Sequence, residues 1–279
     1  MQEIGKVKEE DLHNLYKLTD LFERHRKEGI CVAFSGGVDS SLLLKIACEV
    51  GKNHQIPVLA VTFETRLHPQ GDLKAARELA LSFGATHKTI KIDEFSDPEL
   101  INNPVDRCYR CKKLLFSNLI KFAHQEGFHY LIDGSNYDDL KAYRPGMKAL
   151  KELEIESPLL ALEITKDQIR SLAAGLSIAT SNRPSAPCLA TRLPYGAKLD
   201  YELFERLDKG EAYIKSLGFY NVRLRLHEDI LRIEIDQKDM AKLLEHKEHI
   251  VARLKELKFI YITLDLEGFR SGSMDIYIQ

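Results

Sequence analysis

Ser35-Gly36-Gly37-Val38-Asp39-Ser40-Ser41 is the most informative segment of the chain for its fold. It follows Ile30 to Phe34, an apolar run typical of a buried strand, and it leads into residues 40–50, which are apolar enough for a helix packed on a sheet. Two glycines let the backbone turn tightly and bring its N–H groups close to an anion, and a helix N-terminus adds a favourable dipole. The stretch therefore predicts a strand, a phosphate-binding loop and a helix.

The same alternation of strand and helix continues outward from this loop. We expect strands and helices over these ranges: helix 10–27, strand 57–63, helix 72–84, strand 86–92, helix 111–127 and strand 129–134. This rhythm predicts an α/β fold, a parallel sheet with helices on both faces. Ligands of such sheets bind at the carboxyl ends of the strands, where the phosphate loop lies.

The pattern changes near residue 197. Thr165 and Gln168 predict a capping box at the start of a further helix, and residues 181–196, with three prolines, predict a long loop. After Gly196 we expect helix 201–217, strands 221–226 and 230–235, helix 237–256 and strand 258–265. The sequence therefore predicts two domains, a parallel-sheet domain over 1–196 and a smaller α+β domain over 197–279.

Composition narrows the class of protein. The 279 residues are 44% hydrophobic and 29% charged, which is typical of a globular protein with a sizeable core. Lys+Arg 40 against Asp+Glu 42 gives a formal net charge of −2, so no global basic field would attract tRNA or an anionic membrane. We found no secretory signal and no apolar run that could span a bilayer, and we expect a cytoplasmic protein.

The polar side chains of the loop suit a polyphosphate. The hydroxyls of Ser35, Ser40 and Ser41 can donate hydrogen bonds to it, and the carboxylate of Asp39 can hold Mg²⁺. The loop lacks the Gly-Lys-Ser/Thr ending of a Walker P-loop, so it does not indicate simple hydrolysis of a γ-phosphate.

The five cysteines divide by position. An odd number with one close pair argues against a secreted disulfide framework. Cys31 and Cys48 have apolar neighbours and are most simply core residues. Cys108 and Cys111 lie among basic residues, just before the helix expected over 111–127, and such surroundings favour thiolates. Cys188 lies in the proline-rich loop.

Three thiolates suit a [4Fe-4S] cluster with one iron left open, so Cys108, Cys111 and Cys188 are candidate cluster ligands. A tetrahedral zinc site would need a second cysteine pair. A redox dithiol with a separate reactive Cys188, or three inert cysteines, stay as alternatives.

Basic residues near the C-terminus are candidate ligands for a substrate phosphate. Arg223 and Arg225 alternate along an expected strand and so share a face. Arg192, Arg270 and the hydroxyl of Ser271 lie in loops, and arginine suits bidentate phosphate binding. The simpler interpretation is a pair of exposed strand arginines.

The loop resembles the pyrophosphate-binding loop of the ATP pyrophosphatase (PP-loop) superfamily. Its members cleave ATP between the α and β phosphates and adenylate a carboxylate or carbonyl group. The resemblance implies that residues 62–65, beginning at Thr62, border the adenine and that Gly134 borders the ribose. It also implies that Lys112 and Arg144 neutralise phosphate charge. A solvated helix face explains Lys112 equally well, and we favour it for Lys113.

The whole chain is similar to the LarE family of ATP-dependent sulfur transferases, on these motifs: SGGVDSS, NNPVDRCYRCK, YRPG, PSAPCLATRLPYG, VRLRLHEDILRIEI and TLDLEGFRSGSM. The resemblance implies adenylation, with ATP and Mg²⁺, of the carboxylates of pyridinium-3,5-dicarboxylate mononucleotide. Sulfur then replaces oxygen, giving thiocarboxylates for the nickel-pincer nucleotide cofactor.

The resemblance also implies roles for individual residues. Members with one cysteine, at the position of Cys188, give up its sulfur, and members with three are associated with a [4Fe-4S] cluster that delivers sulfide. Glu211 and Glu234 match positions that hold a divalent metal, although a solvated helix face is the simpler interpretation of Glu211. We expect a homo-oligomer, and the sequence does not identify the sulfide donor.

Three other functions compete. A tRNA thiolase of the same superfamily predicts tight, salt-sensitive tRNA binding, which the net charge disfavours. An ammonia-using amide ligase resembling GMP or NAD synthetase predicts a protein without iron or acid-labile sulfide. A non-catalytic nucleotide sensor predicts ATP binding without release of pyrophosphate.

Overall fold

The computed structural model describes residues 7–25, 27–68, 71–141, 144–181, 188–270 and 272–275. The chain forms two compact units. The first takes residues 1–65, 70–93 and 108–185, and the second takes residues 66–69, 94–107 and 186–279. Each unit has its own sheet and core.

The sheet of the first unit is parallel, as the sequence predicts. Its strands are β1 (Ile30–Ala33), β2 (Val58–Glu64), β3 (Thr86–Lys91) and β4 (Tyr130–Ile132), in the order β3-β2-β1-β4. Glu156 adds a further parallel bridge to Ile132.

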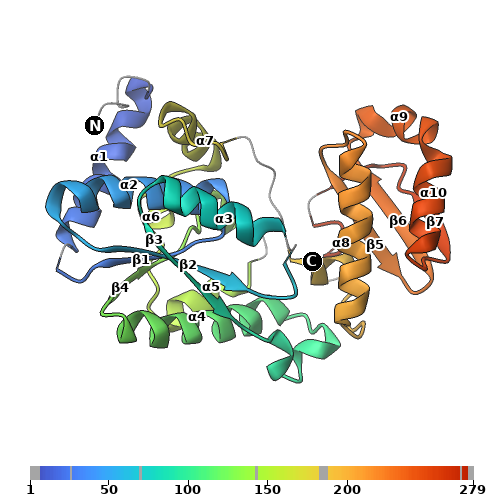
Figure 1. The fold of residues 1–279 in the computed structure, drawn as a ribbon, viewed down its shortest axis with the longest axis horizontal. Helices are drawn as coiled ribbons and strands as arrows, with labels where there is room; N and C mark the ends of the chain where they lie inside the picture. The colour runs from blue at the N-terminus through green and yellow to red at the C-terminus, as the bar shows by residue number, and fades with distance from the viewer. Residues whose placement is uncertain are drawn as a thin grey trace. The chain divides into compact units, whose positions relative to one another are not determined.

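Helices cover both faces of this sheet (Figure 1). The helices are α1 (Glu9–Arg24), α2 (Val38–His54), α3 (Gly71–Ser82), α4 (Arg107–Gln125), α5 (Gly146–Glu152), α6 (Pro158–Ala161) and α7 (Lys166–Gly175), with the 3₁₀ turn η4 (Tyr137–Lys141). α1, α2, α3 and α7 share one hydrophobic core, whereas α4 and α5 pack in another on the opposite face. No helix within the described ranges is long and apolar enough to cross a membrane.

Side chains alternate between these two cores along β1. Ile30 and Val32 pack toward α2, and Cys31 packs toward α4. Burial raises the pKa of Cys31 and of Cys48 to about 12, which keeps both thiols protonated. Both are therefore core residues, as the sequence indicates.

Helix α4 begins four residues earlier than predicted. The sequence places its start at Cys111, but the helix starts at Arg107, whose N–H donates to the carbonyl of Pro104. The apolar period of this helix starts only at Leu114, so hydrophobic periodicity could not detect the polar first turns. Cys108 consequently lies within the helix, as Cys111 does, and not before it.

The second unit has a three-stranded sheet with helices packed on it. Its elements are η2 (Glu94–Ser96), η3 (Leu100–Asn102), η5 (Leu189–Arg192), α8 (Tyr201–Ser216), β5 (Val222–His227), β6 (Ile230–Ile235), η6 (Gln237–Asp239), α9 (Met240–Glu245), α10 (Lys247–Glu256) and β7 (Tyr261–Leu264). β6 is central, antiparallel to β5 and parallel to β7. The single helix expected over 237–256 is interrupted at His246.

The second unit is larger than the expected domain of residues 197–279. It includes residues 66–69 and 94–107, and Leu67 and Phe95 from these segments pack in its core. Leu67 is fully buried in that core, and the buried carboxylate of Glu94 accepts the N–H groups of Arg66 and Leu67 at 3.4 and 3.3 Å. Local sequence patterns carry no signal for such distant packing.

Candidate active site

The stretch from Ser35 to Ser41, called the phosphate loop below, turns tightly between β1 and α2. Gly36 has a φ of +73°, a left-handed conformation that favours glycine. A Cβ atom at Gly36 would lie 3.1 Å from the Cβ atom of Ala76 on α3. Both the backbone conformation and the packing therefore require glycine at this position.

The serines of the phosphate loop fix its shape. The hydroxyl of Ser35 accepts the N–H of Gly37 at 3.2 Å, and the hydroxyl of Ser40 donates to the carbonyl of Gly37 at 3.2 Å. The N–H groups in the first turn of a helix have no acceptor within that helix and attract anions. These hydrogen bonds fix the course of the backbone around Gly37.

Asp39, in the first turn of α2, contacts two side chains that sequence analysis missed. Its carboxylate accepts hydrogen bonds from Lys166 Nζ at 2.5 Å and from the amide of Asn136 at 3.1 Å. Lys166 is the first residue of α7, directly after the predicted capping box of Thr165 and Gln168, which the structure confirms. A lysine ammonium group therefore lies beside the phosphate loop.

Gly134 follows β4 and packs against the same helix turn. A Cβ atom at Gly134 would lie 3.1 Å from the backbone nitrogen of Ser40 and 3.3 Å from Cβ of Asp39. A larger residue would displace the phosphate loop, so this close approach explains the glycine independently of any contact with ribose.

Lys112 belongs to the same end of the sheet. Its Nζ donates to Asp133, at the end of β4, at 3.3 Å, and a Cβ atom at Gly146 would lie 2.9 Å from its Cδ. Lys112 is therefore paired with Asp133, the residue before Gly134, and packed against Gly146 rather than freely solvated. Lys113 instead lies on the surface, where it donates to Glu152 at 2.9 Å.

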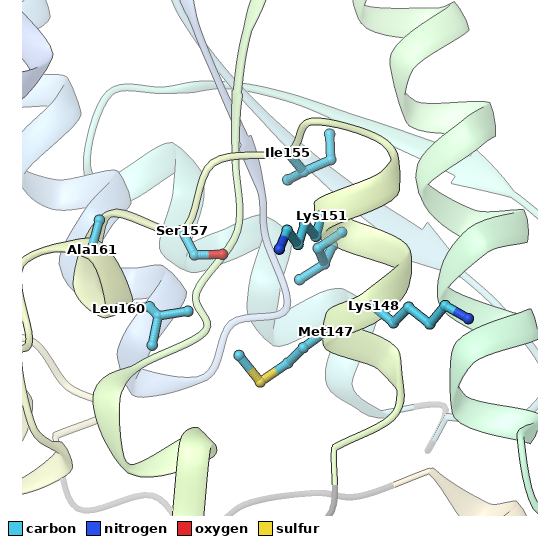
Figure 2. Close-up of a pocket in the computed structure, with 8 residues that line it drawn as sticks. Met147, Lys148, Lys151, Ile155, Ser157, Leu160 and Ala161 are labelled. Atoms are coloured by element: carbon cyan, nitrogen blue, oxygen red, sulfur yellow. The ribbon is translucent and has the colours of Figure 1, made fainter.

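Asp133 is buried and collects several donors. The hydroxyls of Ser135 and Ser157 donate to it at 2.7 and 2.5 Å, in addition to Lys112. Ser157 also lines a pocket of about 490 Å³ between α5 and α6. In Figure 2, Met147 and Leu160 line this pocket from opposite sides, and Lys148 points away from it. Ser157 thus lines a mainly apolar pocket and also donates a hydrogen bond to Asp133, the carboxylate that pairs with Lys112.

Thr62 is buried on β2 next to the end of β1, whereas Arg144 lies on the surface. The Thr62 hydroxyl donates to the carbonyl of Phe34 at 2.8 Å and lies 2.8 Å from His87 Nε2. Burial, with a smaller contribution from Arg77, lowers the pKa of His87. Arg144 is more than half exposed and pairs with Asp139 at 2.8 Å.

Two of the three candidate cluster cysteines share a helix face. Cys108 and Cys111 are three residues apart in the first turns of α4 and are half-buried. Cys188 precedes η5 in the second unit and is also half-buried. Among the residues that the structure describes, no group of three or more His, Cys, Asp or Glu side chains is arranged to hold a metal ion.

The second unit contains two buried ion pairs. Arg192 Nε and Nη2 donate to Glu211 at 2.6 and 2.9 Å, and Arg225 Nε donates to Glu234 at 3.1 Å. The sequence pattern of its helix suggested that Glu211 is solvated, but the side chain is fully buried. Burial favours a raised pKa for Glu211, but the charge and hydrogen bonds of Arg192 more than offset this and lower it.

Arg223 and Arg270 have different surroundings. Arg223 is not an exposed strand residue but is buried over the ring of Phe269, and burial together with the charges of Arg192 and Arg225 lowers its pKa to about 10. Arg270 is one-third exposed and pairs with Asp265 at 3.1 Å. Ser271 and residues 182–187 of the proline-rich loop lie outside the described residues.

Comparison with known proteins places this geometry in a family. Residues 10–95 match the model of the PP-loop domain. Pyridinium-3,5-bisthiocarboxylic acid mononucleotide synthase from Lactiplantibacillus plantarum is 36% identical over 247 residues, which cover 88% of both chains. The chain belongs to the LarE family. An uncharacterised protein of Synechocystis sp. is 35% identical over 246 residues, which are 88% of this chain and 91% of that relative.

As a member of the LarE family, the chain is an enzyme, an ATP-dependent sulfur transferase. Its similarity to a tRNA thiolase is shorter. The tRNA-specific 2-thiouridylase MnmA from Rickettsia bellii is 28% identical over 200 residues, covering 58% of this chain and 53% of MnmA. The similarity to the LarE synthase, in contrast, extends through most of both chains.

Four residues of this LarE-family site were not predicted from the sequence: Asn136, Asp133, Ser157 and Lys166. Asp133 and Asn136 flank Gly134 just after β4, at the carboxyl edge where ligands bind, so strand position was an available signal. The capping box likewise marked the helix start at which Lys166 lies. Ser157 follows the bridge of Glu156 to β4, which local sequence patterns do not reveal.

Proposed function

We propose that this enzyme adenylates the carboxylates of pyridinium-3,5-dicarboxylate mononucleotide and converts them to thiocarboxylates for the nickel-pincer nucleotide cofactor. The printed name of the L. plantarum relative, a synthase of the bisthiocarboxylic acid mononucleotide, supports this substrate. The observation that carries the proposal is the phosphate loop with Lys166 paired to its Asp39, together with Lys112 paired to Asp133, the residue before Gly134 that packs against the loop. Such a site suits a polyphosphate that leaves as pyrophosphate.

The first stage forms an acyl-adenylate. The substrate carboxylate attacks the α-phosphorus of ATP, and the bond to the bridging oxygen of the β-phosphate breaks. The N–H groups of the phosphate loop, with Ser35 and Ser40, bind the leaving pyrophosphate, and Lys112 and Lys166 offset its charge. Because hydrogen bonds within the loop hold these groups in place, they are suited to stabilise the charge that develops in the transition state.

Asp39 is the proposed ligand for Mg²⁺. Its carboxylate supplies the hard oxygen donors that this ion prefers, and its side chain is 20% exposed. Bound Mg²⁺ would neutralise part of the phosphate charge. Thr62 and Gly134 are proposed to border the adenine and the ribose, and the exposed Arg144 is proposed to contact phosphate.

The second stage replaces AMP by sulfur. Sulfide attacks the acyl carbon, the bond to the adenylate oxygen breaks, and AMP leaves with that oxygen. We propose Cys188, Cys108 and Cys111 as the residues that handle sulfur. By donor chemistry these three thiols suit a [4Fe-4S] cluster, which would present sulfide at its open iron. The described side chains are not gathered into a three-ligand group, so this assignment rests on donor chemistry.

The second unit is proposed to bind the phosphate of the mononucleotide. Arg223 is the strongest candidate because burial and the nearby positive charges of Arg192 and Arg225 lower its pKa, and a bound anion would stabilise its charged form. Arg270 is the second candidate. Arg192 and Arg225 already pair with Glu211 and Glu234, so they are weaker candidates, and the pairing also leaves the two carboxylates less suited to a metal ion. A cytoplasmic homo-oligomer remains part of the proposal.

Release of AMP tests the adenylation step. Purified protein is incubated with ATP, Mg²⁺ and pyridinium-3,5-dicarboxylate mononucleotide, and AMP and pyrophosphate are quantified. We expect both products in equal amounts, dependent on the mononucleotide. ATP binding without either product would favour a nucleotide sensor, and release that depends on tRNA instead would favour a thiolase.

A further inference from the structure

Cys188 lies at the start of a turn whose backbone is held by specific side chains. The Cys188 carbonyl accepts the N–H of Thr191 at 3.1 Å and the hydroxyl of Thr191 at 2.7 Å. Leu189 and Ala190, the next two residues, are buried in the core of the second unit. The position of the cysteine therefore depends on how this turn is anchored.

One buried ion pair anchors the turn from α8. Glu211 binds Arg192 through two hydrogen bonds, at 2.6 and 2.9 Å, which leaves the remaining guanidinium nitrogen for other contacts. That nitrogen, Nη1, donates to the Thr191 hydroxyl at 2.9 Å and reaches the Cys188 carbonyl at 3.5 Å. The carboxylate on α8 thereby fixes the hydroxyl that holds Cys188.

A second buried ion pair anchors the same turn from the sheet. Arg225 on β5 donates through Nε to Glu234 on β6 and through Nη1 to the Thr191 carbonyl at 2.7 Å. Glu234 is itself held by Ser273 at 2.7 Å. Thr191 therefore accepts a hydrogen bond from Arg192 at its hydroxyl and one from Arg225 at its carbonyl.

We propose that Glu211 and Glu234 are positioning residues that act through Arg192, Arg225 and Thr191 to fix Cys188 for sulfur transfer. The hydrogen-bonded path runs from each carboxylate to an arginine and on to Thr191, one hydrogen bond from the cysteine backbone. This role rests on the proposed use of Cys188 in sulfur handling. It gives the two glutamates, first considered as metal ligands, a function that needs no metal.

Stability alone is a poor explanation of this arrangement. Buried ion pairs contribute little net stability compared with well-packed apolar residues, because both charges lose their hydration. Here, however, each guanidinium group has a second donor that contacts the cysteine turn, which a hydrophobic pair could not provide. The geometry therefore favours placement of the turn as the role of the two pairs.

Thr191 offers a matched pair of variants that spares the buried charges. Thr191→Val removes the hydroxyl with little change in volume, and Thr191→Ser retains it. The readout is the alkylation rate of Cys188 by iodoacetamide in the native full-length protein, followed by peptide mass mapping. We expect Thr191→Val to change this rate about fivefold, the factor for one hydrogen bond of average strength. Thr191→Ser should restore the wild-type rate.

Glu211→Gln extends the test to the carboxylate, and Leu254→Ala, in the core of the same unit, controls for general destabilisation. We expect Glu211→Gln to change Cys188 alkylation and to lower kcat for thiocarboxylate formation without changing KM for ATP, whereas Leu254→Ala does neither. An unchanged alkylation rate in both Thr191→Val and Glu211→Gln would overturn the proposal. If the wild-type protein forms no thiocarboxylate, the proposed function fails, but the alkylation rates still test the positioning.

Discussion

Lys166 Nζ and the carboxylate of Asp39 lie 2.5 Å apart, which joins the first turn of α7 to the first turn of α2 beside the phosphate loop. Loss of either charge should therefore affect ATP more than any other ligand.

Asp39→Ala and Lys166→Ala should each lower the rate of AMP formation by about 100-fold or more, because each removes a charge placed for the phosphates. Steady-state assays with varied ATP measure the effect. Lys74→Ala, which removes an 86%-exposed lysine from α3, is the matched control. Full activity of Asp39→Ala would refute its role as a metal ligand.

His87 should make the fold less stable in mild acid. Burial lowers its pKa below the ordinary 6.5, so the folded protein favours the neutral ring. The associated stability is present above pH 6.5 and is lost as the pH falls through the lowered pKa. Thermal unfolding from about pH 7.5 to 5.5 should show a larger loss for the wild type than for His87→Gln. Equal losses would contradict this explanation.

Glu234→Gln should lower the free energy of unfolding by about 3 kcal/mol, because it leaves the buried guanidinium of Arg225 without its counter-charge. Urea denaturation provides the measurement. Glu205→Gln, at a half-exposed pair with Arg66, should change stability by about 0.5 kcal/mol or less. Similar effects of the two substitutions would show that the buried pair has no special importance.

Cys108→Ala should retain AMP formation and stop thiocarboxylate formation, because the cysteine is assigned to the second stage. Iron and acid-labile sulfide, measured after anaerobic isolation or reconstitution, should be present in the wild type and lost in the variant. Retained thiolation over several turnovers would exclude the cluster mechanism. Conversion of Cys188 to dehydroalanine in the wild type would show that the protein gives up its own sulfur.

Arg223→Ala should weaken binding of the pyridinium mononucleotide about tenfold or more and leave ATP binding unchanged, because a charged hydrogen bond to phosphate is lost. Calorimetric titration with each ligand measures the difference. Arg253→Ala, on the surface of α10, is the control. Unchanged affinity would return Arg223 to a purely structural role.

Local patterns were sufficient to predict the sheet of the first unit and several of its helices. The parallel strands and the Thr165 capping box each depend on residues close together in the sequence, and the structure confirms them. The start of α4 was misplaced because its first turns are polar, with Cys108 and Cys111 among them.

The rest of the site depends on contacts between distant residues. Lys166 lies 127 residues from Asp39, and Arg192 lies 19 residues from Glu211, so neither pair has a local signature. The second unit likewise incorporates Leu67 and Glu94 through packing and hydrogen bonds. The presence of an arginine on a strand does not indicate whether its guanidinium group will pair with a carboxylate of the protein or with a ligand.

The central claim is that this enzyme exchanges carboxylate oxygen for sulfur on a pyridinium mononucleotide. The most direct test is mass spectrometry of the mononucleotide after anaerobic incubation of the protein with ATP, Mg²⁺ and sulfide. The account predicts a product in which carboxylate oxygen has been replaced by sulfur, formed together with AMP. An unchanged mononucleotide, in a reaction where ATP binding is demonstrated, would contradict it.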